Sequence, residues 1–329
     1  MYSKKYLTGN APEGIDEDRA FMARVAWLYY EEGLTQQQIA KRLGITRLRV
    51  NKLLSNARKE GVVQIRIVGP MAGCFALETK LKTEFGLQNC IIVPTPDDPL
   101  MIRDMIGIAC ANYLTKSLTS GDVLGTAWGS TVFDVARHLK SMEIDNFSVV
   151  SLLGGLTNDP PSLNPFDIAK TVADKCGGKC YYLFAPSIVD SREIRDAIMS
   201  DGRFRSTFEI AQKASKALLG IGEATEDAIL VKTGFINASK MAELRLKGAV
   251  GDLLGRFFDI DGRLIEDDIN DKVIGLSLED IRTIDVVIGV AGGSSKIRPI
   301  LGALRGRHIN VLITDEVTAQ SVLDANVKL

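Results

Sequence analysis

Residues 35–57, TQQQIAKRLGITRLRVNKLLSNA, contain two short helical patterns joined by a glycine. Thr35 is placed to cap the first helix with its hydroxyl, and Gln38 completes a capping box. Gly44 supplies the turn, because a residue without Cβ adopts positive φ at little cost. Thr46 is placed to cap the second helix. This order of caps, helices and turn predicts a helix-turn-helix.

Apolar and small side chains in this stretch fall where two crossing helices need them. These are Ile39, Ala40, Leu43, Gly44, Ile45, Val50 and Leu53. The side chains outside this core project from the N-terminal part of the second helix. In a helix-turn-helix this part enters the DNA major groove. We expect the DNA contacts to come from Thr35, Gln36, Thr46, Arg47, Leu48, Arg49, Asn51 and Lys52. Arg47 and Asn51 have the donors and acceptors to recognise guanine and adenine, whereas Lys52 suits phosphates.

The charge balance separates this segment from the rest of the chain. Residues 33–68 hold eight basic side chains and one acidic side chain, so the segment carries a net charge of +7. The whole chain carries −1, which leaves −8 for the remainder. A basic segment joined to an acidic body is typical of a nucleic-acid-binding module fused to another domain.

Working outward, the chain divides into three expected parts: a flexible arm at 1–18, a DNA-binding domain at 19–69, and an effector-binding and oligomerisation domain at 70–329. Helical spacing predicts a first helix at 19–31, and the alternating VVQIRIV at 62–68 predicts a short wing strand. No stretch approaches the roughly 18 apolar residues of a membrane span, and the start lacks the apolar core of a signal peptide. We therefore expect a cytoplasmic protein without membrane contacts.

From residue 71 onward, β-type runs alternate with helical patterns. Strands are expected at 89–93, 122–127, 147–153, 180–184, 227–231, 285–290 and 310–314. Helices are expected at 74–85, 100–118, 131–141, 165–176, 190–200, 204–218, 295–305 and 315–325. This alternation predicts an α/β fold, with a doubly wound, largely parallel sheet covered by helices on both faces. Ligands of such sheets bind beyond the carboxyl ends of the strands.

Three glycine-rich loops follow predicted strands. The loop at 128–131 precedes a helix, so backbone N–H groups and two hydroxyls form a phosphate cradle there. The loop at 291–296 adds a lysine to a second helix start. One such loop is weak evidence because tight turns also require glycine, but three favour a shared anionic or polyhydroxylated ligand. We expect effector contacts from Gly129, Ser130, Thr131, Gly154, Gly155 and Lys296. Asp252 fits either a sugar hydroxyl or a helix cap.

Other classes of function are less well supported. Five cysteines and two histidines lack the spacing of a metal site, and we expect neither a metal nor a cofactor. A sugar-phosphate isomerase-like enzyme is the alternative, but it needs a positioned base and acid. The one candidate pair, Asp315-Glu316, fits a helix N-terminus equally well, so we expect no enzymatic activity. A domain that only assembles an oligomer would not require the intact loops at Ser130-Thr131 and Lys296.

Taken in order, the motifs resemble the SorC family of sugar-binding transcriptional regulators. The resemblance extends from about Phe21 to Leu323 and rests on AWLYYEEGLTQQQIAKRLGITRLRVNKLL, GDVLGTAWGSTV, VVSLLGG, YYLFAP, GAVGDLLGRFFDIDG, VVIGVAGGSSK and VLITDEVTA. It implies an effector domain similar in fold to sugar-phosphate isomerases, a homo-oligomer that is commonly a tetramer, and control of a carbohydrate or polyol catabolic operon. Of the two directions of control, repression and activation, we expect repression.

The resemblance also implies an effector site. Its residues would be Gly129, Ser130, Thr131, Gly154, Gly155, Asp252 and Lys296. The effector would be a sugar, a sugar phosphate or a polyol, and the partner would be operator DNA. The segment AWLYYEEGLTQ is most similar to the polyol-responsive branch, whose effectors are related to erythritol.

Overall fold

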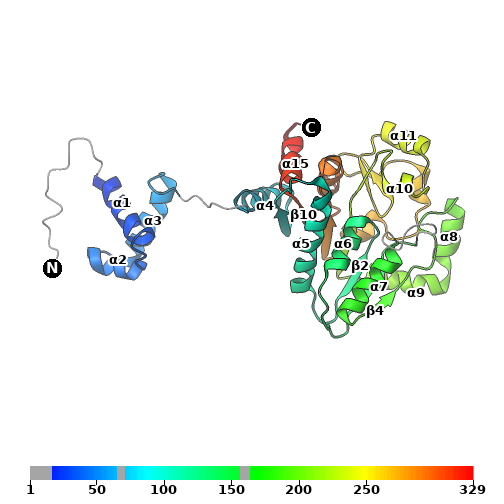
Figure 1. The fold of residues 1–329 in the computed structure, drawn as a ribbon, viewed down its shortest axis with the longest axis horizontal. Helices are drawn as coiled ribbons and strands as arrows, with labels where there is room; N and C mark the ends of the chain where they lie inside the picture. Colours follow the sequence, from blue (N-terminus) through cyan, green and yellow to red (C-terminus); the bar gives the residue numbers. More distant parts are fainter. Residues whose placement is uncertain (1–16, 65–70, 156–163, 329) are drawn as a thin grey trace. The chain divides into compact units, whose positions relative to one another are not determined.

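The computed structural model describes residues 17–64, 71–155 and 164–328 (Figure 1). The chain divides into two compact units, Met1–Val68 and Gly69–Leu329, and each has its own hydrophobic core. Within the described ranges, none of the helices is long and apolar enough to cross a membrane.

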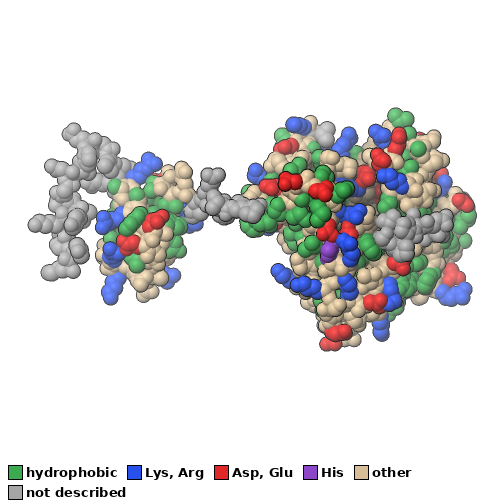
Figure 2. All heavy atoms as spheres, viewed as in Figure 1, with side chains coloured by type: hydrophobic (Ala, Val, Ile, Leu, Met, Phe, Trp, Pro, Cys, Tyr) green, Lys and Arg blue, Asp and Glu red, His purple; other side chains and the backbone are tan. Residues whose placement is uncertain are grey.

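Three helices make up the described part of the smaller unit, residues 17–64: α1 (Glu17–Tyr30), α2 (Gln36–Leu43) and α3 (Arg47–Lys59). The first helix therefore begins two residues before the start predicted from periodicity, inside the expected arm; the rest of that arm, 1–16, lies outside the described residues. The buried side chains that join the helices are Met22, Val25, Ala26, Leu28, Ile39, Ala40, Val50, Leu54 and Ala57. The visible face of this unit carries basic side chains (Figure 2).

The wing strand predicted at 62–68 does not form over its described part. Residues 61–64 make a turn after α3, in which the Val63 N–H donates to the Ala57 carbonyl at 2.9 Å. Val62 and Val63 pack against the core of the three helices, and this contact removes their apolar side chains from water without a partner strand. Residues 65–68 of the predicted strand lie outside the described residues.

A seven-stranded parallel sheet forms the centre of the larger unit, as the alternating pattern predicted. Its order is β1-β10-β9-β5-β2-β3-β4, and each neighbouring pair runs parallel. The strands are β1 (Asn89–Val93), β2 (Val123–Thr126), β3 (Ser148–Ser151), β4 (Lys179–Tyr181), β5 (Lys216–Gly220), β9 (Val286–Val290) and β10 (Val311–Asp315).

Helices cover both faces of this sheet. The described helices of the larger unit are α4 (Ala72–Phe85), α5 (Ile102–Ser117), α6 (Ser130–His138), α7 (Pro165–Cys176), α8 (Arg192–Ser200), α9 (Gly202–Gln212), α10 (Ile229–Lys232), α11 (Ala238–Leu246), α12 (Asp268–Asp271), α13 (Leu278–Arg282), α14 (Ile297–Arg305) and α15 (Glu316–Lys328), with single 3₁₀ turns η1 (Pro99–Met101) and η2 (Ser294–Lys296). Successive strand residues alternate between two cores: Leu218 belongs to the core that includes residues of α5, α6 and α7, whereas Leu219 belongs to the core that includes residues of α4, α14 and α15.

Two predicted elements are wrong. The helix expected at 204–218 ends at Gln212, and β5 occupies 216–220. Because β5 is central and buried on both faces, its apolar run lacks the alternation of a half-buried strand. The strand expected at 227–231 is instead the short helix α10. Brief apolar runs fit either structure, so periodicity alone does not separate them.

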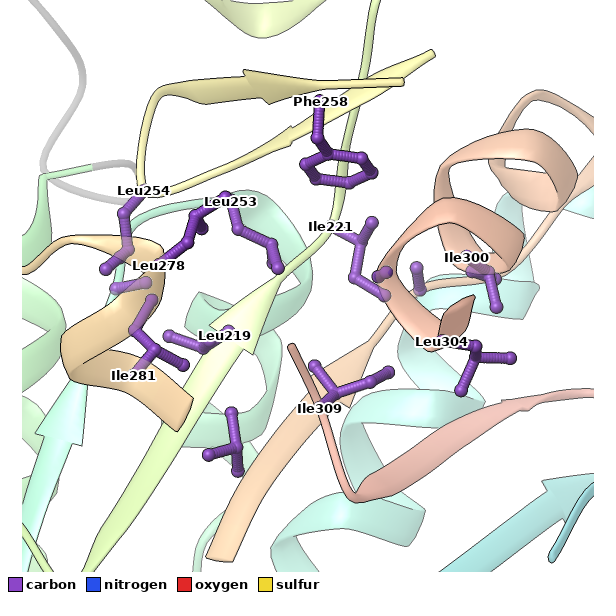
Figure 3. Packing of buried hydrophobic residues seen from close by; sticks show 14 of the residues in the cluster. Leu219, Ile221, Leu253, Leu254, Phe258, Leu278, Ile281, Ile300, Leu304 and Ile309 are labelled. Carbon is purple, nitrogen blue, oxygen red and sulfur yellow. The ribbon is translucent and has the colours of Figure 1, made fainter. Parts of the chain in front are cut away.

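A second, antiparallel sheet covers the end of β5. It consists of β6 (Gly222–Glu223), β7 (Gly251–Leu253) and β8 (Arg256–Phe258). A two-residue turn joins β7 to β8, with Leu254 and Gly255 both at positive φ, as a type I′ hairpin requires. In Figure 3, Leu253 lies near Leu219, and Phe258 lies above Ile221. Apolar packing therefore fixes this hairpin over the carboxyl end of the central strand.

Candidate functional site

The N-terminal part of α3 presents the side chains expected to contact DNA. Thr46 caps this helix by accepting the Arg49 N–H at 3.2 Å, and its backbone is extended, as at most N-caps. The side chains of Thr46, Arg47, Leu48, Arg49, Asn51 and Lys52 are all exposed. Leu48 is 79% exposed and makes this surface partly apolar.

The turn between α2 and α3 has the predicted geometry. Thr35 and Gln38 form a complete capping box, in which the Gln38 N–H donates to the Thr35 hydroxyl at 3.3 Å. Gly44 has φ of +67°, a left-handed conformation, and it ends α2. Thr35 is exposed and Gln36 half-buried at the start of α2, so this helix start is available for a backbone phosphate.

A cavity of about 170 Å³ lies at the carboxyl ends of β2, β5 and β9 in the larger unit. The residues that line it are Trp128, Gly129, Ser130, Thr131, Gly220, Ile221, Gly222, Glu223, Asp227, Ala228, Ile229, Leu230, Lys232, Asp252, Val290 and Lys296. Its place beyond the strand ends, where the loops after neighbouring strands meet, is typical of ligand sites in open α/β sheets.

The start of α6 forms one wall of this cavity. Gly129 precedes the helix with φ of +116°, and no side chain of the described residues caps it. The first N–H groups of α6 therefore have no capping acceptor from this segment, and the Ser130 and Thr131 side chains are half-buried beside them. Such a helix start binds phosphates and other anions through its N–H groups and its dipole.

Asp252 contributes a buried carboxyl group to the cavity. Its side chain is accommodated because Gly222, opposite it in the β6–β7 pair, has no Cβ; a Cβ there would overlap Asp252 Oδ1. Asp252 Oδ2 accepts the Gly255 N–H at 3.0 Å, which stabilises the hairpin turn. Burial raises the pKa of Asp252 to about 7, because the charged form loses its hydration. With this pKa, the Asp252 carboxyl group changes between its protonated and its charged form near neutral pH.

Lys296 lies on η2, after β9, and contacts two groups from the segment that follows β5. Its ammonium donates to the Ile221 carbonyl at 2.9 Å and forms an ion pair with Glu223. Burial lowers the pKa of Lys296 to about 8, because the charged form loses its hydration. The pair joins two strand-end loops across the cavity wall.

Asp315, the candidate base of the alternative enzyme, holds the glycine-rich loop in place. Its Oδ1 accepts the Gly293 N–H at 3.1 Å and the Thr318 hydroxyl at 2.5 Å. Its Oδ2 accepts the Thr95 hydroxyl at 2.7 Å and the Thr318 N–H at 3.2 Å. With these four hydrogen bonds and 1% exposure, Asp315 supports the loop that carries Lys296 and caps α15.

Five of the seven expected effector residues line this one cavity: Gly129, Ser130, Thr131, Asp252 and Lys296. Gly154 and Gly155 do not, although they follow β3. Their backbone packs against Ala185, Pro186 and the ring of Phe166, so both positions need glycine for close packing. Sequence reasoning missed Glu223, because its partner lies 73 residues away and local spacing gives no signal for the contact.

No cluster of three His, Cys, Asp or Glu side chains suited to a metal ion occurs in residues 17–64, 71–155 and 164–328. The cysteine pair nearest in sequence, Cys176 and Cys180, is free, and Cys176, the last residue of α7, is fully buried in the core.

Comparisons with known proteins match both units. A family model described as "Putative sugar-binding domain" matches residues 69–324, and one described as "Sigma-70, region 4" matches residues 24–60. The deoxyribonucleoside regulator of Bacillus subtilis is 33% identical over 310 residues, which cover 94% of this chain and 98% of the relative. The erythritol catabolism regulatory protein EryD of Brucella abortus is 30% identical over 310 residues, with the same two shares.

A solved structure gives the same architecture. The full-length sorbitol operon regulator SorC from Klebsiella pneumoniae matches with a TM-score of 0.74 at 28% identity, and the match covers 94% of this chain and 100% of that chain. The relatives named here are thus regulators, and the match extends over both the helical unit and the sheet unit.

Proposed function

The chain belongs to the SorC family of sugar-binding transcriptional regulators, and on this premise we propose that it is a cytoplasmic repressor of a carbohydrate or polyol catabolic operon. In this proposal the smaller unit binds operator DNA, and a phosphorylated sugar or polyol in the cavity at the carboxyl ends of β2, β5 and β9 releases the DNA. The observation that carries the proposal is the convergence of an uncapped helix start, a lysine and a buried carboxyl group on one cavity.

Each part of this cavity suits a different part of such an effector. The α6 start, with the Ser130 and Thr131 hydroxyls, has the donors for a phosphate. Asp252 has acceptors for hydroxyl groups, and Lys296 has donors for them. Asp315 accepts four hydrogen bonds from within the protein, so it is not free to take a proton from a substrate as a catalytic base. This supports a domain that binds its ligand rather than one that converts it.

A ligand screen tests the effector class directly. Sugars, polyols and their phosphates are screened by thermal shift, since a ligand that binds the native state raises its apparent stability. Each ligand that stabilises the protein is then added to the operator complex. We expect Lys296→Ala to bind operator like wild type but to lose release by the effector. Normal release in this variant would remove Lys296 from the site.

Two substitutions on α3 test operator recognition. Arg47→Ala is expected to weaken operator binding by about 1–3 kcal/mol and to relax preference at one base pair. Lys52→Ala is expected to weaken binding to all DNA sequences equally and to lower the salt dependence by about one unit of slope. Fluorescence anisotropy with operator and random duplexes at several salt concentrations measures both. Equal losses on both duplexes for Arg47→Ala would contradict base recognition by that residue.

We propose that the protein acts as a homotetramer through its larger unit. An effector releases DNA only by binding the DNA-free arrangement more tightly than the DNA-bound one, and an oligomer offers two such arrangements. Analytical ultracentrifugation of the full chain tests the assembly, and a monomer at micromolar concentration would exclude it.

A further inference from the structure

Both lysines that line the cavity have carboxylate partners within the described part of the chain. Lys296 pairs with Glu223, and the two side chains are only 22% and 17% exposed. Lys232 pairs with Asp227 at 3.4 Å on the outer, solvent-facing side. A lysine whose charge is already balanced attracts an incoming anion far less than a free one.

The start of α6 differs from the Lys296 side in this respect. No side chain of the described segments caps it, so its N–H groups and hydroxyls keep their attraction for an anion. The acidic side chains that line the cavity are Glu223, Asp227 and Asp252. The cavity therefore has one side, at the start of α6, that attracts an anionic group. On its other side the charge of Lys296 is already balanced by the Glu223 carboxylate.

We infer that Glu223 restricts the effector to a single anionic group, bound at the start of α6, and that hydroxyl groups occupy the side formed by Lys296, Glu223 and Asp252. This inference rests on the proposed function and narrows its ligand class to monophosphates. The buried ion pair joins Glu223 of β6 to Lys296 of η2, which places the restricting carboxylate inside the cavity wall.

Hydrogen-bond chemistry supports this division. A hydroxyl group both donates and accepts, so it inserts beside an ammonium–carboxylate pair and satisfies both members. A second phosphate instead brings another negative charge, and it would approach the Glu223 carboxylate in a cavity of about 170 Å³. At the few ångströms that such a space allows, repulsion between two half-buried like charges corresponds to about tenfold or more in a dissociation constant.

Inorganic phosphate and pyrophosphate are the probes, because they carry one and two phosphoryl groups and need no knowledge of the natural effector. The chain has two tryptophans, Trp27 in the smaller unit and Trp128 in the cavity wall. In a Trp27→Phe background, fluorescence therefore reports from Trp128 alone. Five proteins are titrated with each anion: the parent, Glu223→Gln, Lys296→Met, the double variant with both substitutions, and the control Glu226→Gln, which removes an exposed carboxylate outside the cavity lining.

We expect the parent and Glu226→Gln to bind pyrophosphate no more tightly than phosphate. Glu223→Gln is expected to prefer pyrophosphate by about tenfold, and adding Lys296→Met to Glu223→Gln abolishes that gain. Lys296→Met alone leaves phosphate affinity within about twofold, because phosphate binds at α6.

Three results would overturn the inference: a parent that already prefers pyrophosphate, the same preference in Glu223→Gln as in the parent, or a Glu223→Gln protein that binds neither anion. The proposed function is tested separately by operator release with sugar and polyol phosphates. A protein released equally well by a monophosphate and by a bisphosphate would contradict the role of Glu223 alone and leave the proposed function standing.

Discussion

Replacing Asp252 by asparagine is expected to make the protein more stable and less responsive. Asp252 is 4% exposed, and its carboxyl group has one hydrogen bond from the Gly255 N–H. Asparagine keeps the shape and an oxygen that accepts this hydrogen bond, but it has no charge to desolvate. The variant therefore isolates the free-energy cost of keeping an ionisable group at this position of the cavity.

The magnitude follows from the pKa of Asp252, which burial raises from its ordinary value of 3.8 to about 7. The folded state holds the proton more tightly than the unfolded state, so the stability from this group is complete below pH 3.8 and is lost as the pH rises through 7. At about 1.4 kcal/mol per pKa unit, the full cost above pH 7 is about 4 kcal/mol. Between pH 5 and pH 8, the variant should gain about 2.5 kcal/mol relative to wild type.

Urea unfolding of the full chain, followed through Trp128 in the Trp27→Phe background, measures this difference at each pH. Asp285→Asn, an exposed position outside the cavity lining, is the control and should show no such trend. The same Asp252→Asn protein should bind operator normally but respond less to effector, since stability and ligand binding compete at such sites. A difference between variant and wild type that stays constant from pH 5 to pH 8 would refute this reasoning.

Two further substitutions test the geometry of the two sites. Gly222→Ala places a Cβ against Asp252 Oδ1, so the carboxyl group must move and its hydrogen bond from the Gly255 N–H is lost. We expect urea unfolding to show a loss of about 1–3 kcal/mol in stability, and effector titration to show a weaker response. Unchanged unfolding and effector titrations would contradict this packing. Thr46→Ala removes the cap of α3 and should cost the smaller unit about 1 kcal/mol and weaken operator binding, as measured by thermal unfolding and anisotropy; Thr46→Ser should restore both, and equal behaviour of the alanine and serine variants would contradict the cap.

The helix-turn-helix could be predicted in detail because its signals are local. Thr35 and Thr46 cap helices through N–H groups three residues away, and Gly44 ends α2 by its own conformation. The described part of the predicted wing strand, residues 62–64, does not form a strand, for the opposite reason. Val62 and Val63 have no neighbouring strand to pair with, and they pack against the core of the three helices instead.

The central strand of the sheet was missed because its context is entirely non-local. Residues 216–220 follow a helix without a glycine or proline between them, and neighbours on both sides supply their hydrogen bonds. Lys216 at the start of β5 resembles a surface helix residue in sequence, but it is half-buried and pairs with Asp122 at 2.6 Å. The strands of the small sheet have two or three residues each, which is too short for a periodic signal.

The candidate cavity was predictable wherever a glycine-rich loop marked the end of a strand. Ser130, Thr131 and Lys296 follow β2 and β9, which flank β5 in the sheet, so their loops meet. Glu223 has no such mark, because only the pairing of β5 with β9 brings it to Lys296. Gly154 and Gly155 follow β3, one strand further from β5, where a neighbouring segment packs directly on their backbone.

The outer wall of the cavity differs in construction from its floor. The floor comes from strand ends fixed by the sheet, whereas the wall includes α10, a helix of four residues followed by a turn at Gly234. Asp227 and Lys232 line the cavity with mostly exposed side chains, so replacing them removes no core packing. Substitutions in this one segment would thus retune which compound is detected at little thermodynamic cost, a route by which gene duplication could yield regulators for new nutrients from a single scaffold.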